Sequence, residues 1–184
     1  VPEQGFTQNE LATPVGDEGR GGRRNAPSLY NLAFQQSLFW DGREQSLEDQ
    51  VWSPLLARNE MANPSKEAVL ARLNTIPAYQ AAFAENYDQG LTAQTLGLAL
   101  AAYQRALISG NSAFDRWYFA PTQNAHSTAD FGAEATRGFA VFQKQGCHSC
   151  HTLTKENALF TDGNFYNTGT GLLREQRGIM PKRV

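Results

Sequence analysis

The segment Cys147-His-Ser-Cys150-His151 constrains this 184-residue chain more than any other part of its sequence. Two thiols three positions apart on one helical turn can add to the two vinyl groups of a haem. The histidine that follows directly can then point its imidazole at the iron as the proximal ligand. The motif therefore predicts a haem c bound covalently through Cys147 and Cys150, with His151 on the iron.

Other uses of paired cysteines explain the pattern less well. A structural zinc site needs four ligands, and the sequence has no second Cys-x-x-Cys pair and no His-x₃-His pair. A thioredoxin-type dithiol requires alternating strands and helices, which this sequence does not indicate. A disulfide framework needs more cysteines at wider spacing. We therefore favour haem, and we expect His148, inside the motif, to face solvent.

The sixth position of the iron has few candidates in this sequence. Met61 and Met180 are the only methionines, and His126 is the only histidine outside the motif. We expect that none of these three residues is the sixth ligand of the iron. Met61 should lie in the core, His126 at the surface of a polar linker and Met180 in a loop near the end of the chain.

Composition excludes some classes of function. Hydrophobic residues make up 41% of the chain and charged residues 18%, as in ordinary soluble domains. The net charge of −2 argues against a nucleic-acid partner, and no apolar run approaches the roughly 20 residues of a transmembrane segment. The sequence starts with Val1-Pro2 rather than with Met or a secretory signal, which fits a processed or cut chain.

Helical periodicity, with almost no strand pattern, predicts an all-α fold with long ordered loops. Residues 1–45 are rich in glycine, proline and charge and should form mostly loop. A first helix should start at Ser46, where Ser-Leu-Glu-Asp is close to a capping box, and should end by Pro54. Further helices are expected at residues 65–77, 77–87, 92–109, 114–119 and 133–145, with a linker at 121–130. The apolar stripe of the helix at 92–109 should consist of Leu96, Ala99, Leu100, Tyr103 and Leu107.

Several short segments occur in a specific order and spacing. They are Gly5-Phe-Thr7, Arg24-Asn-Ala-Pro-Ser-Leu29, Leu38-Phe-Trp-Asp-Gly-Arg43, Ser46-Leu-Glu-Asp-Gln50, Asn59-Glu-Met61, Phe114-Asp-Arg116, Gly138-Phe-Ala-Val-Phe142 and the haem motif. Together they resemble the bacterial di-haem cytochrome c peroxidases and their MauG-like relatives. The resemblance covers nearly the whole chain.

This resemblance implies two cytochrome c-like domains, each with one haem c. Residues 1–130 would be the peroxidatic domain without its own haem-binding motif, and residues 131–184 the start of an incomplete electron-relay domain. The motif at Cys147 matches the relay haem, so one haem is expected on this chain and two in the intact protein. Another Cys-x-x-Cys-His should precede Gly5, and the distal ligand of the relay haem should lie far beyond His151. The sequence therefore looks truncated at both ends.

The resemblance also implies roles for three side chains. Trp40 matches a tryptophan between the two haems, where an indole can bridge electron transfer. Gln50 and Glu60 match the distal pocket of the peroxidatic haem, with Pro54 and Met61 as pocket neighbours. A carboxylate there can take a proton from the near oxygen of peroxide and return it to the departing oxygen. From the residues alone, Trp40 would be a core residue and Gln50 and Glu60 would be exposed polar residues.

Two further features of the first domain follow from the resemblance. Asn25 matches the side-chain ligand of a calcium ion between the domains, and an amide oxygen suits this hard cation. The other calcium ligands would be backbone carbonyls and water. Residues 11–22 contain no histidine, although many members have one there that caps the peroxidatic iron until reduction moves it. This departure favours members whose peroxidatic haem is permanently open, including MauG-like enzymes that oxidise protein side chains.

The implied function is a periplasmic di-haem peroxidase, since attachment of haem c requires export in bacteria. It would reduce hydrogen peroxide with electrons from a small donor protein, either a cytochrome c or a copper protein. A MauG-like oxidase that acts on a protein substrate is one alternative. A non-enzymatic single-haem electron-transfer protein is the other, although such a carrier has no need for Gln50, Glu60 and Trp40 at these spacings.

Overall fold

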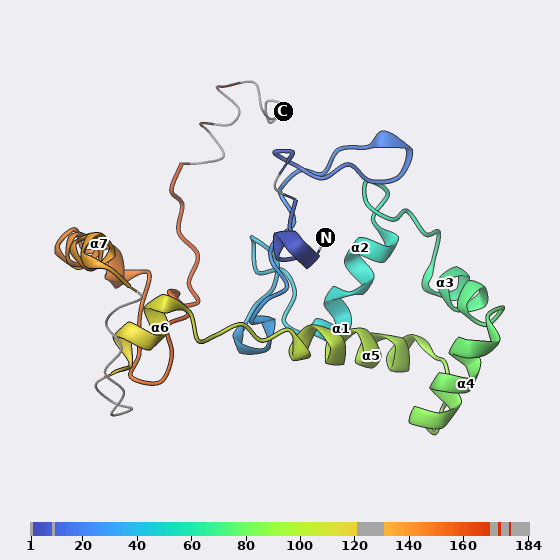
Figure 1. Cartoon of the computed structure of the whole chain (residues 1–184). Helices are drawn as coiled ribbons and strands as arrows, with labels where there is room; N and C mark the ends of the chain where they lie inside the picture. The colour runs from blue at the N-terminus through green and yellow to red at the C-terminus, as the bar shows by residue number, and fades with distance from the viewer. Residues whose placement is uncertain (1, 9, 121–130, 170–172, 174–176, 178–184) are drawn as a thin grey trace. The chain divides into compact units, whose positions relative to one another are not determined.

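The structure is a computed structural model that describes residues 2–8, 10–120, 131–169, 173 and 177 (Figure 1). Within these residues it is all-α, and β-structure is confined to two isolated bridges, Val15 with Gly21 and Leu38 with Glu44. The chain divides into two compact units. The first unit consists of residues 1–108 and 167–184, and the second consists of residues 109–166. The expected linker at 121–130, with His126, lies outside the described residues, as does Met180. The domain boundary after residue 130 stays a prediction.

Side-chain caps start three helices of the first unit where the sequence predicts. Ser46, Ser65 and Thr92 each accept a hydrogen bond from the backbone N–H three residues later. These caps start α1 (Leu47–Gln50), α3 (Lys66–Leu73) and α5 (Ala93–Ala106). The unit also contains α2 (Trp52–Leu56) and α4 (Pro77–Asn86), which begin without a side-chain cap. Residues 2–45 form loops with the short 3-10 turns η1 (Pro2–Gln4), η2 (Asp17–Gly19) and η3 (Leu32–Phe34), as expected.

The first helix, α1, ends at Gln50, before Pro54, as predicted, and Pro54 lies in a separate short helix, α2. Pro54 is the third residue of α2, and a residue in the first turn has no intrahelical partner for its N–H. The missing donor therefore costs nothing here. The prediction that Met61 lies in the core is wrong, since this side chain is 62% exposed in the turn after α2.

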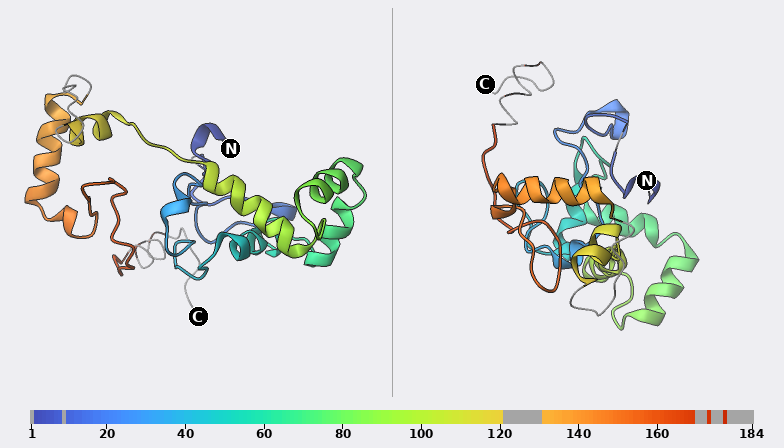
Figure 2. Two further views of the ribbon diagram at one scale, coloured as in Figure 1. Left: turned by 90° about the horizontal axis from the view of Figure 1, so that it is seen from below. Right: turned by 60° about the vertical axis from the view of Figure 1, so that its left-hand side comes forward.

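Helix α5 runs alongside α1 and η3, with α3 and α4 near its N-terminal end (Figure 2). One core cluster joins α2 to the three longer helices through Val51, Trp52, Val69, Phe83 and Leu96. A second cluster consists of Leu38, Leu47 and Ala101. Arg105 and Glu48 add a two-pronged ion pair between α5 and α1, with nitrogen–oxygen distances of 2.7 and 3.1 Å.

The predicted apolar stripe of α5 is confirmed at Leu96, which is buried, but not at Leu100 and Tyr103. Leu100 and Tyr103 are 36% and 56% exposed, whereas the small residues Gly97 and Ala101 are buried. A Cβ at Gly97 would lie only 2.9 Å from the carbonyl oxygen of Glu48. The close approach of the two backbones, rather than the largest side chains, therefore decides which face of α5 points inward.

The second unit contains α6 (Ala113–Tyr118), α7 (Ala133–Lys144) and the 3-10 turn η5 (Cys147–Ser149), close to the predicted positions. Ser112 and Asp115 form a capping box at the start of α6. An aromatic cluster joins α6 and α7 to the residues that follow η5, and its members are Phe114, Trp117, Tyr118, Phe131, Phe139, Phe142 and Phe160. These rings are only half-buried, so the described part of this unit leaves apolar surface that another group can cover.

Candidate functional site

The Cys-x-x-Cys-His motif folds into one tight turn directly after α7. Gly146 adopts a left-handed conformation with φ of 75°, which permits the sharp exit from the helix. The backbone N–H of His151 donates to the carbonyl of Cys147 at 3.0 Å, so the motif closes on itself. Both cysteines are free thiols; Cys147 is exposed and Cys150 half-buried. His148 is exposed, as predicted.

The imidazole of His151 is oriented by a backbone carbonyl. Its Nδ1 lies 3.0 Å from the carbonyl oxygen of Phe160. A carbonyl oxygen can only accept, so Nδ1 carries the proton and Nε2 keeps a free lone pair for a metal. This is the tautomer that a haem iron requires of a proximal histidine. The His151 side chain is also exposed, so its ring is accessible.

The second unit therefore fits a covalently bound haem. It offers two free thiols at the required spacing, an imidazole with the correct nitrogen available, and apolar surface beside the motif. Phe142 lies 6.4 Å from the His151 ring, and Val141 and Phe165 are 56% and 57% exposed. Exposed apolar side chains of this kind are what a large flat cofactor would cover.

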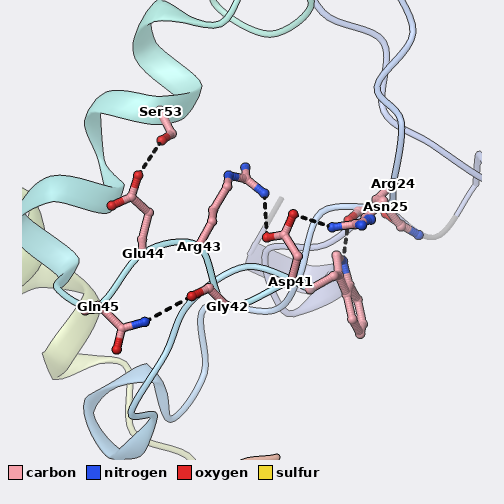
Figure 3. A network of polar contacts seen from close by, with 9 residues as sticks. Arg24, Asn25, Asp41, Gly42, Arg43, Glu44, Gln45 and Ser53 are labelled. Atoms are coloured by element: carbon pink, nitrogen blue, oxygen red, sulfur yellow. Dashed lines mark hydrogen bonds and ion pairs between the residues drawn. The ribbon is translucent and has the colours of Figure 1, made fainter. Parts of the chain in front are cut away.

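Through the carbonyl of Asn25, Trp40 is joined to the polar region of Arg24, Asn25, Asp41 and Arg43 before α1, and Figure 3 labels these four residues. Its indole N–H donates to the backbone carbonyl of Asn25 at 2.7 Å, although the side chain is 59% exposed. The neighbouring Asp41 accepts from Arg24 at 2.8 Å and from Arg43 at 2.9 Å. Burial raises the pKa of Asp41, but the hydrogen bonds from Arg24 and Arg43 outweigh it and hold the pKa below its usual range.

Asn25 carries an unsatisfied buried oxygen. Its side-chain NH₂ donates to the backbone carbonyl of Gln8 at 2.7 Å, which fixes the orientation of the amide. The opposite atom, Oδ1, is buried and has no hydrogen-bond partner among the described residues. Leaving a buried acceptor unsatisfied is costly. A hard cation such as Ca²⁺ binds this type of oxygen, so the geometry fits the predicted ligand.

Gln50 and Glu60 lie on opposite sides of α2 in the sequence. Gln50 is the last residue of α1, and Glu60 lies in the turn after α2; both are half-buried. The turn folds back on the helix, because the N–H of Met61 donates to the carbonyl of Pro54 at 3.1 Å. Among the described side chains no hydrogen bond joins Gln50 to Glu60.

The loop at residues 11–22 is attached to the same turn. The N–H of Asp17 donates to the carbonyl of Glu60 at 2.7 Å, and the guanidinium of Arg20 donates to the carbonyl of Arg58 at 3.0 Å. A Cβ at Gly16 would lie 2.3 Å from the carbonyl oxygen of Asn59, so only glycine permits this contact. The loop that lacks a histidine therefore lies directly against the backbone of Glu60.

Sequence reasoning missed residues 160–166, a segment that is hydrogen-bonded to His151 and Thr152 of the haem motif region. Phe160 supplies the carbonyl that orients His151, and Thr161 accepts from Thr152 at 2.6 Å. A signal was present, because Phe-Thr occurs at both 6–7 and 160–161. The two phenylalanines share a left-handed backbone, with φ of 64° and 54°.

A family model described as di-haem cytochrome c peroxidase matches residues 1–123. The chain belongs to this family. Methylamine utilization protein MauG of Methylorubrum extorquens is 38% identical over 149 residues, 79% of this chain and 39% of that protein. Cytochrome c peroxidase Ccp of Escherichia coli is 34% identical over 139 residues, 76% of this chain and 29% of that protein.

Solved structures of this family have the same fold over most of the chain. The diheme peroxidase BthA from Burkholderia thailandensis aligns with a TM-score of 0.67 at 29% identity, over 82% of this chain and 42% of that one. The chain thus spans less than half the length of the family members that it matches here. None of the described helices is both long and apolar enough to cross a membrane.

Proposed function

We propose that this chain is part of a periplasmic di-haem peroxidase that reduces hydrogen peroxide. Electrons would come from a small donor protein, a cytochrome c or a copper protein, and pass through a haem c bound at Cys147, Cys150 and His151. The observation that carries the haem assignment is the orientation of His151, whose Nδ1 is bound to the Phe160 carbonyl while Nε2 stays free. Family membership supports the peroxidase assignment.

The proposed domain division follows the family. Residues 1–130 would contribute the pocket of a peroxidatic haem whose attachment motif is not in this chain, and residues 131–184 would begin the relay domain. Periplasmic location is part of the same proposal, since haem c is attached outside the cytoplasm in bacteria. When bound, one haem would supply the redox-active iron at which peroxide is reduced, and the other haem would supply the iron that relays electrons.

The residues of this chain would then handle protons and orientation. The Glu60 carboxylate takes a proton from the near oxygen of peroxide and gives it to the departing oxygen, while the Gln50 amide orients the substrate. The position of Glu60 is supported by the backbone bond from Asp17. Trp40, held by its bond to the Asn25 carbonyl, is proposed as the aromatic bridge for electron transfer.

We also propose that Asn25 Oδ1 binds a calcium ion. Its support is the unsatisfied buried oxygen, which a cation would satisfy together with backbone carbonyls and water. Because the Asn25 carbonyl accepts from Trp40, the ion and the indole would stabilise one another's positions.

A MauG-like oxidase of protein side chains is the second candidate. It is favoured by the loop at residues 11–22, which lies against Glu60 and offers no imidazole to cap an iron. The 38% identity to a methylamine utilization protein points in the same direction. A single-haem electron carrier is less well supported, because the family match covers residues 1–123, upstream of the haem motif.

The test uses the full-length haem-loaded protein. A pyridine haemochrome assay should count two haems, where a single-haem carrier holds one. Glu60→Ala should then lower the second-order rate of reaction with peroxide by roughly 10²- to 10⁴-fold, the usual contribution of a positioned acid–base group. Gln50→Ala should lower it less, because an amide orients and transfers no proton. An unchanged rate in Glu60→Ala would contradict the assigned pocket.

A further inference from the structure

Tyr166 and Asp162 form a short hydrogen bond in the segment that follows the haem motif. The Tyr166 hydroxyl donates to Asp162 Oδ2 at 2.6 Å. The other carboxylate oxygen of Asp162 accepts from the backbone N–H of Asn164 at 2.9 Å. The carboxylate is therefore held by its own loop and aimed at the phenol, while the tyrosine side chain is 56% exposed.

This pair belongs to the segment that is bonded to the haem motif. The Cys150 side chain, whose sulfur would carry one of the two covalent bonds to the haem, contributes after Asp162 to the raised pKa of Tyr166. The segment is fixed to the motif by the bonds of Phe160 to His151 and of Thr161 to Thr152. An exposed phenol thus lies in the segment that is bonded to the motif that would hold the haem.

The hydrogen bond reinforces the protonation states that a proton-coupled oxidation needs. The bond to Asp162, followed by the contact with Cys150, raises the pKa of Tyr166 to about 12, so the phenol keeps its proton at neutral pH. The bond from Tyr166, followed by those from Asn164, lowers the pKa of Asp162, so its carboxylate stays ionised. A protonated phenol and an ionised acceptor 2.6 Å apart are poised for transfer of one proton.

We propose that Tyr166 is a redox-active residue, with Asp162 as its proton acceptor, that passes electrons from a donor protein at the surface to the haem bound at Cys150. The proposal rests on the peroxidase function above and adds a residue to its electron path. The oxidant is hydrogen peroxide, acting through the haem. The proposed donor is a protein that would contact the exposed face of the Tyr166 ring.

The step balances in atoms and electrons. Tyr166 gives one electron to the oxidised haem, its O–H bond breaks, and the proton forms a new O–H bond with Asp162 Oδ2. A neutral tyrosyl radical and a protonated carboxyl result. One electron from the donor protein then reduces the radical while the proton returns from Asp162 to the phenolic oxygen. The haem has gained one electron, the donor has lost one, and the pair is restored.

The experiment mixes the full-length haem-loaded protein with hydrogen peroxide in the absence of donor and freezes the mixture for electron paramagnetic resonance. We expect a tyrosyl signal that narrows when the protein contains ring-deuterated tyrosine and that is absent from Tyr166→Phe. In this variant the spectrum of the oxidised haem should persist at least about tenfold longer. Asp162→Asn keeps the phenol but removes the base, and should slow radical formation by about 10²-fold. The matched control is Tyr79→Phe, which removes a similarly exposed hydroxyl on α4.

The outcomes separate this proposal from the proposed function. If peroxide oxidises the haem of the unmodified protein but Tyr166→Phe gives the same signal and the same decay, the redox role of Tyr166 is refuted and the peroxidase proposal stands. If peroxide leaves the haem unchanged, both proposals fail. A tyrosine that only anchored the loop would alter heme retention or thermal stability, but it would give no deuterium-sensitive radical signal.

Discussion

Gly16 offers the sharpest test of how the loop at residues 11–22 is attached to the proposed pocket. Its backbone, with φ of −96° and ψ of −156°, is extended and open to any residue. Steric space alone demands glycine, because a Cβ would lie 2.3 Å from the Asn59 carbonyl oxygen and 2.6 Å from that of Glu60. Gly16→Ala should therefore push the loop and the Glu60 turn apart.

The expected cost of this substitution has two parts. Relief of contacts this short requires a backbone shift of about 1 Å, and overpacking of this kind costs about 1–3 kcal/mol. Loss of the bond from the Asp17 N–H to the Glu60 carbonyl adds about 1 kcal/mol. The sum, about 2–4 kcal/mol, corresponds to a decrease in Tm of roughly 4–16 °C for a chain of this size. The Glu60 carboxylate would move with its backbone, so the rate of reaction with peroxide should fall as well.

The assay compares Gly16→Ala with Gly21→Ala in the same loop. A Cβ at Gly21 meets no atom within 4 Å, so this variant changes the backbone entropy without a clash. Thermal unfolding followed by circular dichroism measures stability, and stopped-flow mixing with peroxide measures the pocket. If the two variants melt together and react at the same rate, the loop is not packed against Glu60 and the steric argument is refuted.

Three further predictions follow from the site. Cys147→Ser should lose stable attachment, so acid–acetone should extract haem that the unmodified motif retains. The pKa of Asp41 is lower in the folded than in the unfolded protein. Its ionised carboxylate therefore stabilises the fold at pH values above the pKa of the unfolded chain, and this contribution is lost as the pH falls. In urea titrations, the difference in free energy of unfolding between the unmodified protein and Asp41→Asn should decrease between about pH 5 and pH 3. Because residues 11–22 offer Asp17 and Glu18 but no imidazole, one haem of the oxidised full-length protein should be high-spin in its absorption spectrum and react with peroxide before any reduction. Two low-spin ferric haems that stay inert until one electron is added would contradict this last prediction.

The chemistry that acts within a few residues could be predicted from the sequence. The haem turn, the caps at Ser46, Ser65 and Thr92, and the helices that they start depend on neighbours one to four positions away. The orientation of His151 could not be predicted this way, because its partner, the Phe160 carbonyl, lies nine residues further along in a loop without periodicity. Family resemblance named Asn25, but no sequence pattern reports that its Oδ1 is buried and unsatisfied.

Tertiary structure decided the features that depend on contacts between segments far apart in the sequence. The inward face of α5 is set by Gly97 against the backbone of Glu48, which overrides the larger apolar side chains Leu100 and Tyr103. Gly16 against Asn59 is the same effect in a loop. A sequence records the size and polarity of each side chain, and those properties determine local turns and caps. Backbone-to-backbone approach depends on where the other segment lies, so it exists only once the chain has folded.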